Sequence, residues 1–251
     1  MLIRIAALAA LPAIFIFGQS KVPDDAPLPP DEAGQKAIIA DVRIKGAEYE
    51  KTVPDYVCTQ ISHHSIDLKG FNQWKTLETV SEQLRFVNHQ GEYTLIAENG
   101  RKASGNEKRP AGLVDVSEFF AVMHSVFDPA TKSEMAWNTW DSVRGHRVHM
   151  IAFGITKQTS VYHIGGPKGP VSGIAGFIYA DADTNAILRV VFAANDTPPK
   201  YPIQASSFDM YYDYARIGDK LYVVPMRADI RHKEGPKQVW DEVDFKEFRK
   251  P

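Results

Sequence analysis

The sequence predicts a mainly β protein of the α+β class, whose antiparallel sheet forms an open barrel or curves strongly. Apolar residues alternate with period two along most of the chain after Pro54, which indicates strands with one buried face. The connections between these stretches are short and contain Gly or Asn, as hairpins require, whereas parallel crossovers need about a dozen residues or more. Two further stretches have helical spacing, and we expect both helices to pack on the concave face of the sheet.

The N-terminal residues 1–20 have the three-part pattern of a bacterial secretory signal peptide. Arg4 precedes a short apolar run that ends at Phe17, and the small residues Gly18 and Ser20 follow where signal peptidase needs them. This run is shorter than the roughly 20 apolar residues that cross a bilayer. We therefore expect cleavage after Ser20, no permanent membrane span, and export to the periplasm or the extracellular space.

A proline-rich linker is predicted for residues 21–32. The stretch 21–30 holds four prolines and two aspartates, a composition that favours extended, solvated chain and cannot build a core. No internal repeat and no shift in composition follows residue 33. Residues 33–251 are therefore predicted to form a single β-rich domain, since a chain of this length supports one hydrophobic core.

The first helix is predicted to begin directly after the linker. Asp31 and Glu32 suit a helix N-terminus because their negative charge complements the partial positive charge of the helix dipole. Apolar residues recur at helical intervals, without proline, as far as Lys51. Pro54 cannot sit inside a helix, so we expect this one to stop near Thr52.

Strand patterns cover most of the remaining chain. The candidate strands are Tyr56–Leu68, Trp74–Val87, Glu92–Glu98, Met135–Val143, Arg147–Thr156, Gln158–Ile164, Gly173–Ala180, Ile187–Ala194, Phe208–Ile217, Lys220–Arg231 and Gln238–Phe248. Each mixes β-branched, aromatic and charged residues in alternation. The glycine-rich segment 165–170, between two of the strands, is a loop of the kind that can cover the mouth of a cavity.

The second helix is predicted over Val114–Phe127, after a polar loop. Asp115 or Ser117 can cap its start, and Asp128–Pro129 ends it. Its broad apolar face consists of Val116, Phe119, Phe120, Met123, Val126 and Phe127. These are too many apolar residues for an exposed helix, so we expect the helix to cover the concave face of the sheet.

The sequence contains no pattern typical of catalysis or of cofactor and metal binding. The net charge of −2 gives no basic field for nucleic acid. Neither paired cysteines, nor an HExxH motif, nor a nucleophile elbow occurs. Cys58 lies in a strand pattern and is predicted to be a buried, unreactive thiol. The acidic group Asp241, Glu242 and Asp244 is interpreted as a solvated part of the last strand. We therefore expect a non-enzymatic protein without catalytic residues, cofactor or metal, and without nucleic acid as a partner.

The aromatic residues allow two interpretations. They are either ordinary core and cross-strand packing, or the lining of an apolar pocket between a curved sheet and its helices. On the second interpretation the candidate ligand-lining residues are Val116, Phe119, Phe120, Met123, Phe127, Phe153, Phe177 and Tyr179. They come from the second helix and from two of the strands.

Short motifs add a family resemblance. The hairpin formed by 176–181 and 187–189 resembles the late hairpin of the lipoprotein-localisation carrier (LolA-like) superfamily. Segments 53–60, 222–225 and 245–249 are similar to those of a group of exported bacterial proteins with that fold. The resemblance implies an unclosed β-barrel with helices on its concave face, and the transport of acyl chains or lipoproteins across the periplasm.

Two functions therefore remain. The first is non-enzymatic binding of an apolar or amphipathic ligand, such as a lipid or acyl chain, in the cell envelope. The alternative is an interaction module that holds a protein or glycan partner through a sheet edge or an aromatic surface. A ligand-binding protein requires a contiguous apolar cavity, whereas an interaction module requires a filled interior and an exposed patch.

Overall fold

The computed structural model describes residues 27–105, 107–194 and 196–251. The predicted signal peptide and the first half of the predicted linker, residues 21–26, lie outside these residues. The helices are α1 (Glu32–Thr52) and α2 (Ser117–Phe127), with a short 3-10 turn, η2 (Pro129–Thr131). The strands are β1 (Tyr56–Asp67), β2 (Lys75–Val87), β3 (Gln90–Glu98), β4 (Arg101–Lys102), β5 (Glu134–Val143), β6 (His146–Ile155), β7 (Ile174–Asp181), β8 (Ile187–Ala194), β9 (Ala205–Ile217), β10 (Lys220–Glu234) and β11 (Lys237–Arg249).

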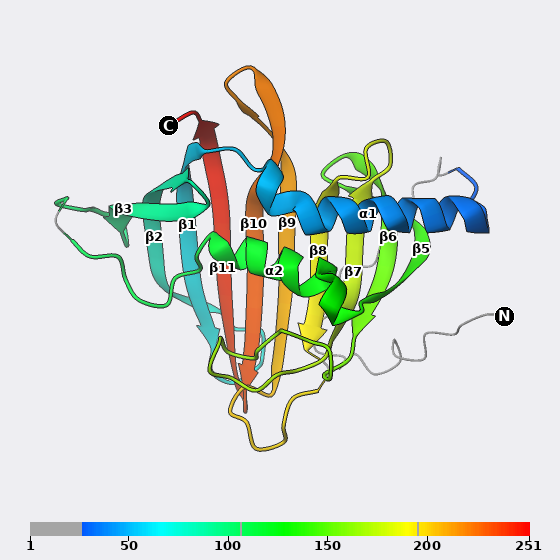
Figure 1. Ribbon diagram of the computed structural model, residues 1–251. Helices are drawn as coiled ribbons and strands as arrows, with labels where there is room; N and C mark the ends of the chain where they lie inside the picture. The colour runs from blue at the N-terminus through cyan, green and yellow to red at the C-terminus, as the bar shows by residue number, and fades with distance from the viewer. Residues whose placement is uncertain (1–26, 106, 195) are drawn as a thin grey trace.

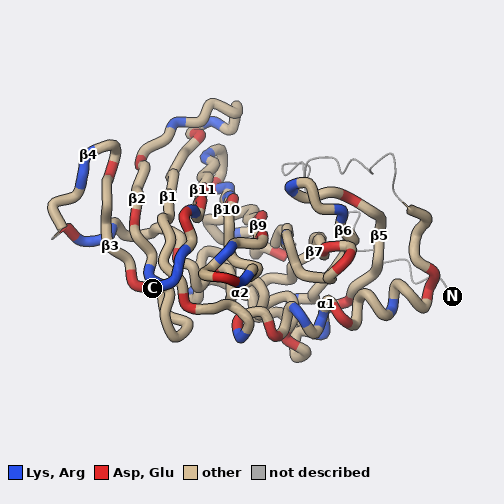
Figure 2. Tube along the Cα trace, turned by 90° about the horizontal axis from the view of Figure 1, so that it is seen from above, with Lys and Arg blue, Asp and Glu red and all other residues tan. Residues whose placement is uncertain are grey.

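The described strands form one antiparallel sheet that is not closed. Its order is β4-β3-β2-β1-β11-β10-β9-β8-β7-β6-β5, so the first long strand pairs with the last. Figure 2 shows β4 and β5 at opposite ends of the sheet. This arrangement confirms the prediction of an open, curved antiparallel sheet with two helices.

Both helices cross the same, concave face of the sheet (Figure 1). The Asp31 side chain caps α1 by accepting a hydrogen bond from the Gly34 N–H at 2.7 Å. The helices approach closely where the Phe127 ring covers Gly46, since a Cβ at Gly46 would lie 2.3 Å from that ring. No helix in the described ranges is long and apolar enough to cross a membrane.

The start of α2 differs from the prediction. The helix begins at Ser117 and not at Val114. Val114 and Asp115 are irregular, whereas Val116, the N-cap residue, already has helical backbone angles. Polar contacts from the sheet hold this segment. The Val114 carbonyl accepts a hydrogen bond from Gln60 Nε2 at 2.9 Å. The Tyr93 hydroxyl accepts one from the Val116 N–H at 2.8 Å. The Asp115 carboxylate accepts one from the Ser117 N–H at 2.9 Å, although neither Asp115 nor Ser117, the predicted caps, is the N-cap residue.

The strand predicted over Gln158–Ile164 is wrong. This segment is irregular and contains a single isolated bridge, from His163 to Val171. Its residues Tyr162 and Ile164 are buried and alternate as in a strand, but β6 and β7 pair directly with each other and leave it no neighbour. The segment instead crosses the concave face below α2 (Figure 1). The structure also contains one strand that the sequence did not predict, the two-residue β4 within the polar loop.

Candidate ligand cavity

A cavity of about 740 Å³ lies between α2, the 157–173 loop and the concave face of the sheet. Its lining residues are Gly112, Val114, Ser117, Glu118, Ala121, Val122, Ser125, Val161, Tyr162, His163, Gly165, Gly166, Pro167, Phe192, Ile203, Phe208, Ile230, His232 and Asp241. Most of the lining is apolar, and the polar side chains are few. Its volume lies within the range of roughly 300–1,000 Å³ that is typical of small-ligand sites.

The sheet forms the apolar floor of the cavity. Phe192 of β8, Phe208 of β9 and Ile230 of β10 are buried neighbours across the sheet. The rings of Phe192 and Phe208 stack with 5.1 Å between their centroids, and Tyr162 packs edge-on against both rings. Aromatic pairs of this kind are rigid, so the floor is preformed.

The second wall is one side of α2. Ser117, Glu118, Ala121, Val122 and Ser125 recur at intervals of three or four residues, so they share one side of the helix. Apart from Val122 they are small or polar. The aromatic residues of α2 point to its other side, and this asymmetry leaves room beside the helix.

The third wall is the 157–173 loop, including the glycine-rich segment expected to cover a cavity mouth. Gly165, Gly166 and Pro167 contribute to the lining. The Ile164 N–H donates to the Pro170 carbonyl at 3.0 Å, which closes the tip of the loop. A Cβ at Gly169 would lie 1.7 Å from the Ile164 carbonyl oxygen, so this close turn requires glycine.

The titratable groups that line the cavity are Glu118, Asp241, His232, His163 and Tyr162. Burial raises the pKa of Glu118 to about 7. A hydrogen bond from the Asp115 backbone N–H and the charge of Arg109 lower this pKa, whereas the charges of Asp115 and Asp241 raise it. Burial also lowers the pKa of His232 below its ordinary value. Asp241 accepts a hydrogen bond of 2.6 Å from Nδ1 of His64 on β1.

An ion pair anchors the chain that leads into α2. Arg109 donates from Nε to both carboxylate oxygens of Glu82, at 3.0 and 3.1 Å, and the Glu82 side chain has an exposed fraction of 0%. The Arg109 guanidinium also lies 4.1 Å from the centre of the Tyr93 ring. Breaking a buried pair of this kind leaves an unpaired charge, so the contact fixes one end of α2 against the sheet.

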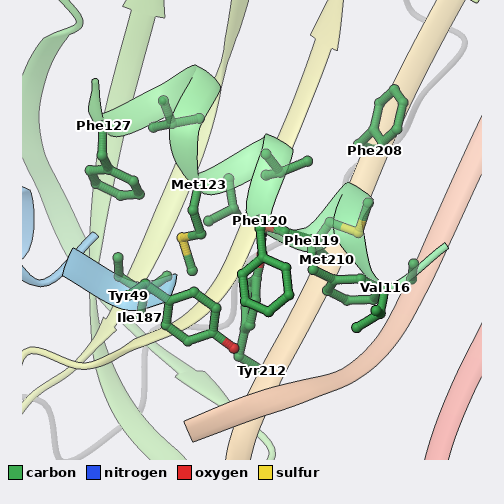
Figure 3. Close-up of a cluster of buried hydrophobic side chains, with 14 of the residues drawn as sticks. Tyr49, Val116, Phe119, Phe120, Met123, Phe127, Ile187, Phe208, Met210 and Tyr212 are labelled. Atoms are coloured by element: carbon green, nitrogen blue, oxygen red, sulfur yellow. Dashed lines mark hydrogen bonds between the residues drawn. The ribbon is translucent and has the colours of Figure 1, made fainter. Parts of the chain in front are cut away.

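The structure places the predicted ligand-lining residues of α2 away from this cavity. Phe119, Phe120, Met123 and Phe127 are buried in the main core, between α2, α1 and the sheet (Figure 3). Phe119 packs edge-on against Tyr212, whose hydroxyl donates to the Phe119 carbonyl at 3.1 Å. Phe120 and Met123 also line a second, smaller hollow of about 250 Å³ between the helices.

The remaining predicted residues are divided between the two faces of the sheet. Val116 and Phe153 belong to the main core. Phe177 and Tyr179 belong to a second cluster with Leu188 and Val191, because odd-numbered residues of β7 face away from the helices. The structure does not bring these four residues to the cavity.

Sequence reasoning missed the polar cavity residues. Asp241 was interpreted as solvated, but it lines the cavity, whereas Glu242 on the opposite face pairs with Arg227 at 2.6 Å. A signal for Asp241 was present, since it alternates with the apolar residues Val239 and Val243 and therefore shares their buried face. His232 carries the same signal, since it follows the buried residues Ala228 and Ile230 at intervals of two along β10. Glu118 and His163 were not identified from the sequence.

Cys58 is buried, as predicted, and burial raises the pKa of its thiol to about 12. A thiol with such a pKa stays protonated at neutral pH and is therefore a poor nucleophile. Among the described residues no group of His, Cys, Asp and Glu side chains could hold a metal ion.

No protein-family model matches this sequence, and no curated protein does either. Similar solved structures include a DUF1329 family protein from Desulfovibrio piger (10% identity, TM-score 0.41, covering 86% of this chain and 92% of that one). A LolA superfamily protein from Nitrosomonas europaea has 7% identity and a TM-score of 0.36, and the alignment covers 86% of this chain and 93% of that one. A putative outer membrane lipoprotein-sorting protein domain from Vibrio parahaemolyticus has 11% identity and a TM-score of 0.41, and the alignment covers 86% of this chain and 91% of that one. These TM-scores are low, so the functional argument rests on the cavity.

Proposed function

We propose that this protein binds one amphipathic molecule, an alkyl or acyl chain with a polar end, in the cavity beside α2. The single observation that carries the proposal is the cavity of about 740 Å³ with an apolar floor and a few polar groups. A preformed apolar space of this size with few polar groups is typical of ligand-binding sites. An interaction module would instead have a filled interior.

The binding is non-enzymatic in this proposal. The polar groups of the cavity include no serine paired with a histidine, and the buried thiol of Cys58 lies elsewhere in the core. The signal-peptide pattern of residues 1–20 supports a role outside the cytoplasm. We therefore propose a carrier or binding protein of the cell envelope whose ligand is a lipid or another amphiphile.

The experiment compares two alanines that line different hollows. Ala121 lines the cavity, and Ala47 on α1 lines the smaller hollow between the helices. Both are exposed, so either accepts a larger side chain. Ala121→Trp should fill the cavity mouth and weaken binding of 1-decanol, measured by displacement of N-phenyl-1-naphthylamine, by at least about tenfold, which is about 1.4 kcal/mol. Ala47→Trp should leave this affinity unchanged.

The neutral alcohol tests chain binding without a charged head. Wild-type protein that binds neither decanol nor the fluorescent probe would contradict the proposal. Equal loss of affinity in both tryptophan variants would place the ligand somewhere other than the cavity beside α2.

A further inference from the structure

We propose that the cavity selects an amphiphile whose polar end is a cationic hydrogen-bond donor, such as a primary amine, over one with a carboxylate or phosphate. This inference rests on the proposed function, because it names the head group of a ligand whose chain the cavity holds. It follows from the charges, the hydrogen-bond capacities and the helix geometry of the lining.

The charged side chains that line the cavity are both acidic. They are Glu118 and Asp241, and no Lys or Arg is among the lining residues. Asp241 already has a partner in His64 at 2.6 Å. Glu118 makes no ion pair within the described part of the chain, although it faces a space large enough for a ligand. The guanidinium of Arg109, whose charge acts on Glu118, is paired with Glu82.

The histidines of the cavity offer acceptors. His163 Nδ1 lies 2.8 Å from the Gly169 carbonyl oxygen, which can only accept, so Nδ1 carries the hydrogen. Nε2 of a neutral His163 is then left as an acceptor. Burial lowers the pKa of His232, which favours the neutral imidazole, and its buried Nδ1 has no partner in the described residues. In the Nε2–H tautomer this Nδ1 is an acceptor. A primary ammonium has three donors and no acceptor, which matches this set.

The N-terminus of α2 does not reverse this preference. Helix N-termini attract anions through free N–H groups and through the helix dipole. Here the first three N–H groups are occupied, because those of Ser117 and Glu118 donate to Asp115 and that of Phe119 donates to Val116. The Asp115 carboxylate therefore already stands where an anionic head group would bind.

The affinity for a cation should depend on the ionisation of Glu118. Its pKa of about 7 means that it loses its proton near neutral pH. The titratable or charged groups around it are Asp115 and Arg109 before α2, Asp241 on β11 with His64, His232 on β10, and Tyr162 and His163 of the loop. A decylammonium ion keeps its charge over this range, since alkyl ammonium groups titrate near 10.4. Binding of decylamine should therefore strengthen as the pH rises from about 6 to about 8.

The test uses three ligands with the same chain: decylamine, 1-decanol and decanoate. At about pH 8 wild-type protein should bind decylamine at least about tenfold more tightly than decanoate, with decanol between them. Glu118→Gln should bring the decylamine affinity to within a few-fold of that for decanol. Glu48→Gln, on the exposed face of α1, removes the same charge far from the cavity and should change nothing.

The possible outcomes distinguish the head-group preference from binding of the alkyl chain. Decanoate that binds as tightly as decylamine, or a decylamine affinity that Glu118→Gln leaves unchanged, would overturn this inference while the proposed function stands. If none of the three ligands binds, the proposed function itself fails. A decylamine affinity that falls as the pH drops from about 8 to about 6, with decanol unaffected, would support the inference.

Discussion

On one side of α2 the concave face of the sheet is filled with aromatic rings, and on the other side it is open. We call these regions the packed half and the cavity half. The packed half consists of Tyr49, Phe86, Phe119, Phe120, Tyr212 and Phe245. Its rings contact one another at centroid distances of 5.2 to 5.8 Å. The cavity half holds the space of about 740 Å³.

The comparison shows how one short helix serves both stability and binding. Phe119, Phe120 and Phe127 join α2 to the sheet and to α1, while Glu118 and Ser125 on its other side leave space. A helix that is apolar all round would fill both halves. The small and polar residues of α2 therefore keep the cavity open, and the aromatic residues hold the helix in place.

The largest expected effect is in the packed half. Phe119→Ala should lower the free energy of unfolding by about 3–5 kcal/mol, because the Phe119 ring is fully buried and its removal leaves a void. Val122→Ala in the cavity wall should cost less than about 2 kcal/mol, since it removes fewer atoms than Phe119→Ala and Val122 already borders an open space. Urea unfolding measures both values. Similar costs for the two variants would mean that the two halves are packed alike.

A smaller effect of opposite sign is expected for Glu118→Gln. Burial raises the pKa of Glu118 from 4.5 to about 7 in the folded protein, so its ionisation destabilises the fold. Glu118 does not lower the stability of the wild type below about pH 4.5, where its carboxyl is protonated in both the folded and the unfolded state. The wild type then loses stability as the pH rises through about 7. At about pH 8 the Gln variant should be more stable than the wild type by about 1–3 kcal/mol.

The measurement is urea unfolding of both proteins at about pH 5 and about pH 8. Glu48→Gln serves as the control, because Glu48 is exposed on α1. A difference in unfolding free energy between wild type and Glu118→Gln that stays constant across this range would show that Glu118 is not buried in the cavity half.

The packed half could be predicted from the sequence far better than the cavity half. The spacing of Phe119, Phe120 and Phe127 correctly indicates a helix on the concave face, because many apolar residues at helical intervals must be buried. Alternation likewise predicts most strands to within a few residues. Helical spacing and alternation are local patterns. They indicate that a residue is buried without showing which element packs against it.

The cavity half depends on which segments meet in space. The 158–164 segment alternates like a strand, and only the direct pairing of β6 with β7 shows that it must be a loop. His163, His232 and Glu118 come from a loop, a strand and a helix far apart in the chain. The sequence interpretation placed the binding site at the aromatic residues of α2, whereas the open space borders the small and polar residues on the other side of this helix.

The most direct test of the account is a crystal structure of the protein grown with 10-bromo-1-decanol. The anomalous signal locates the bromine independently of the protein. We expect a bromine peak inside the cavity half, near Val122, Phe208 and Ile230, with the rings of the packed half in place. A cavity half filled by protein side chains, with no bromine bound there, would contradict the account.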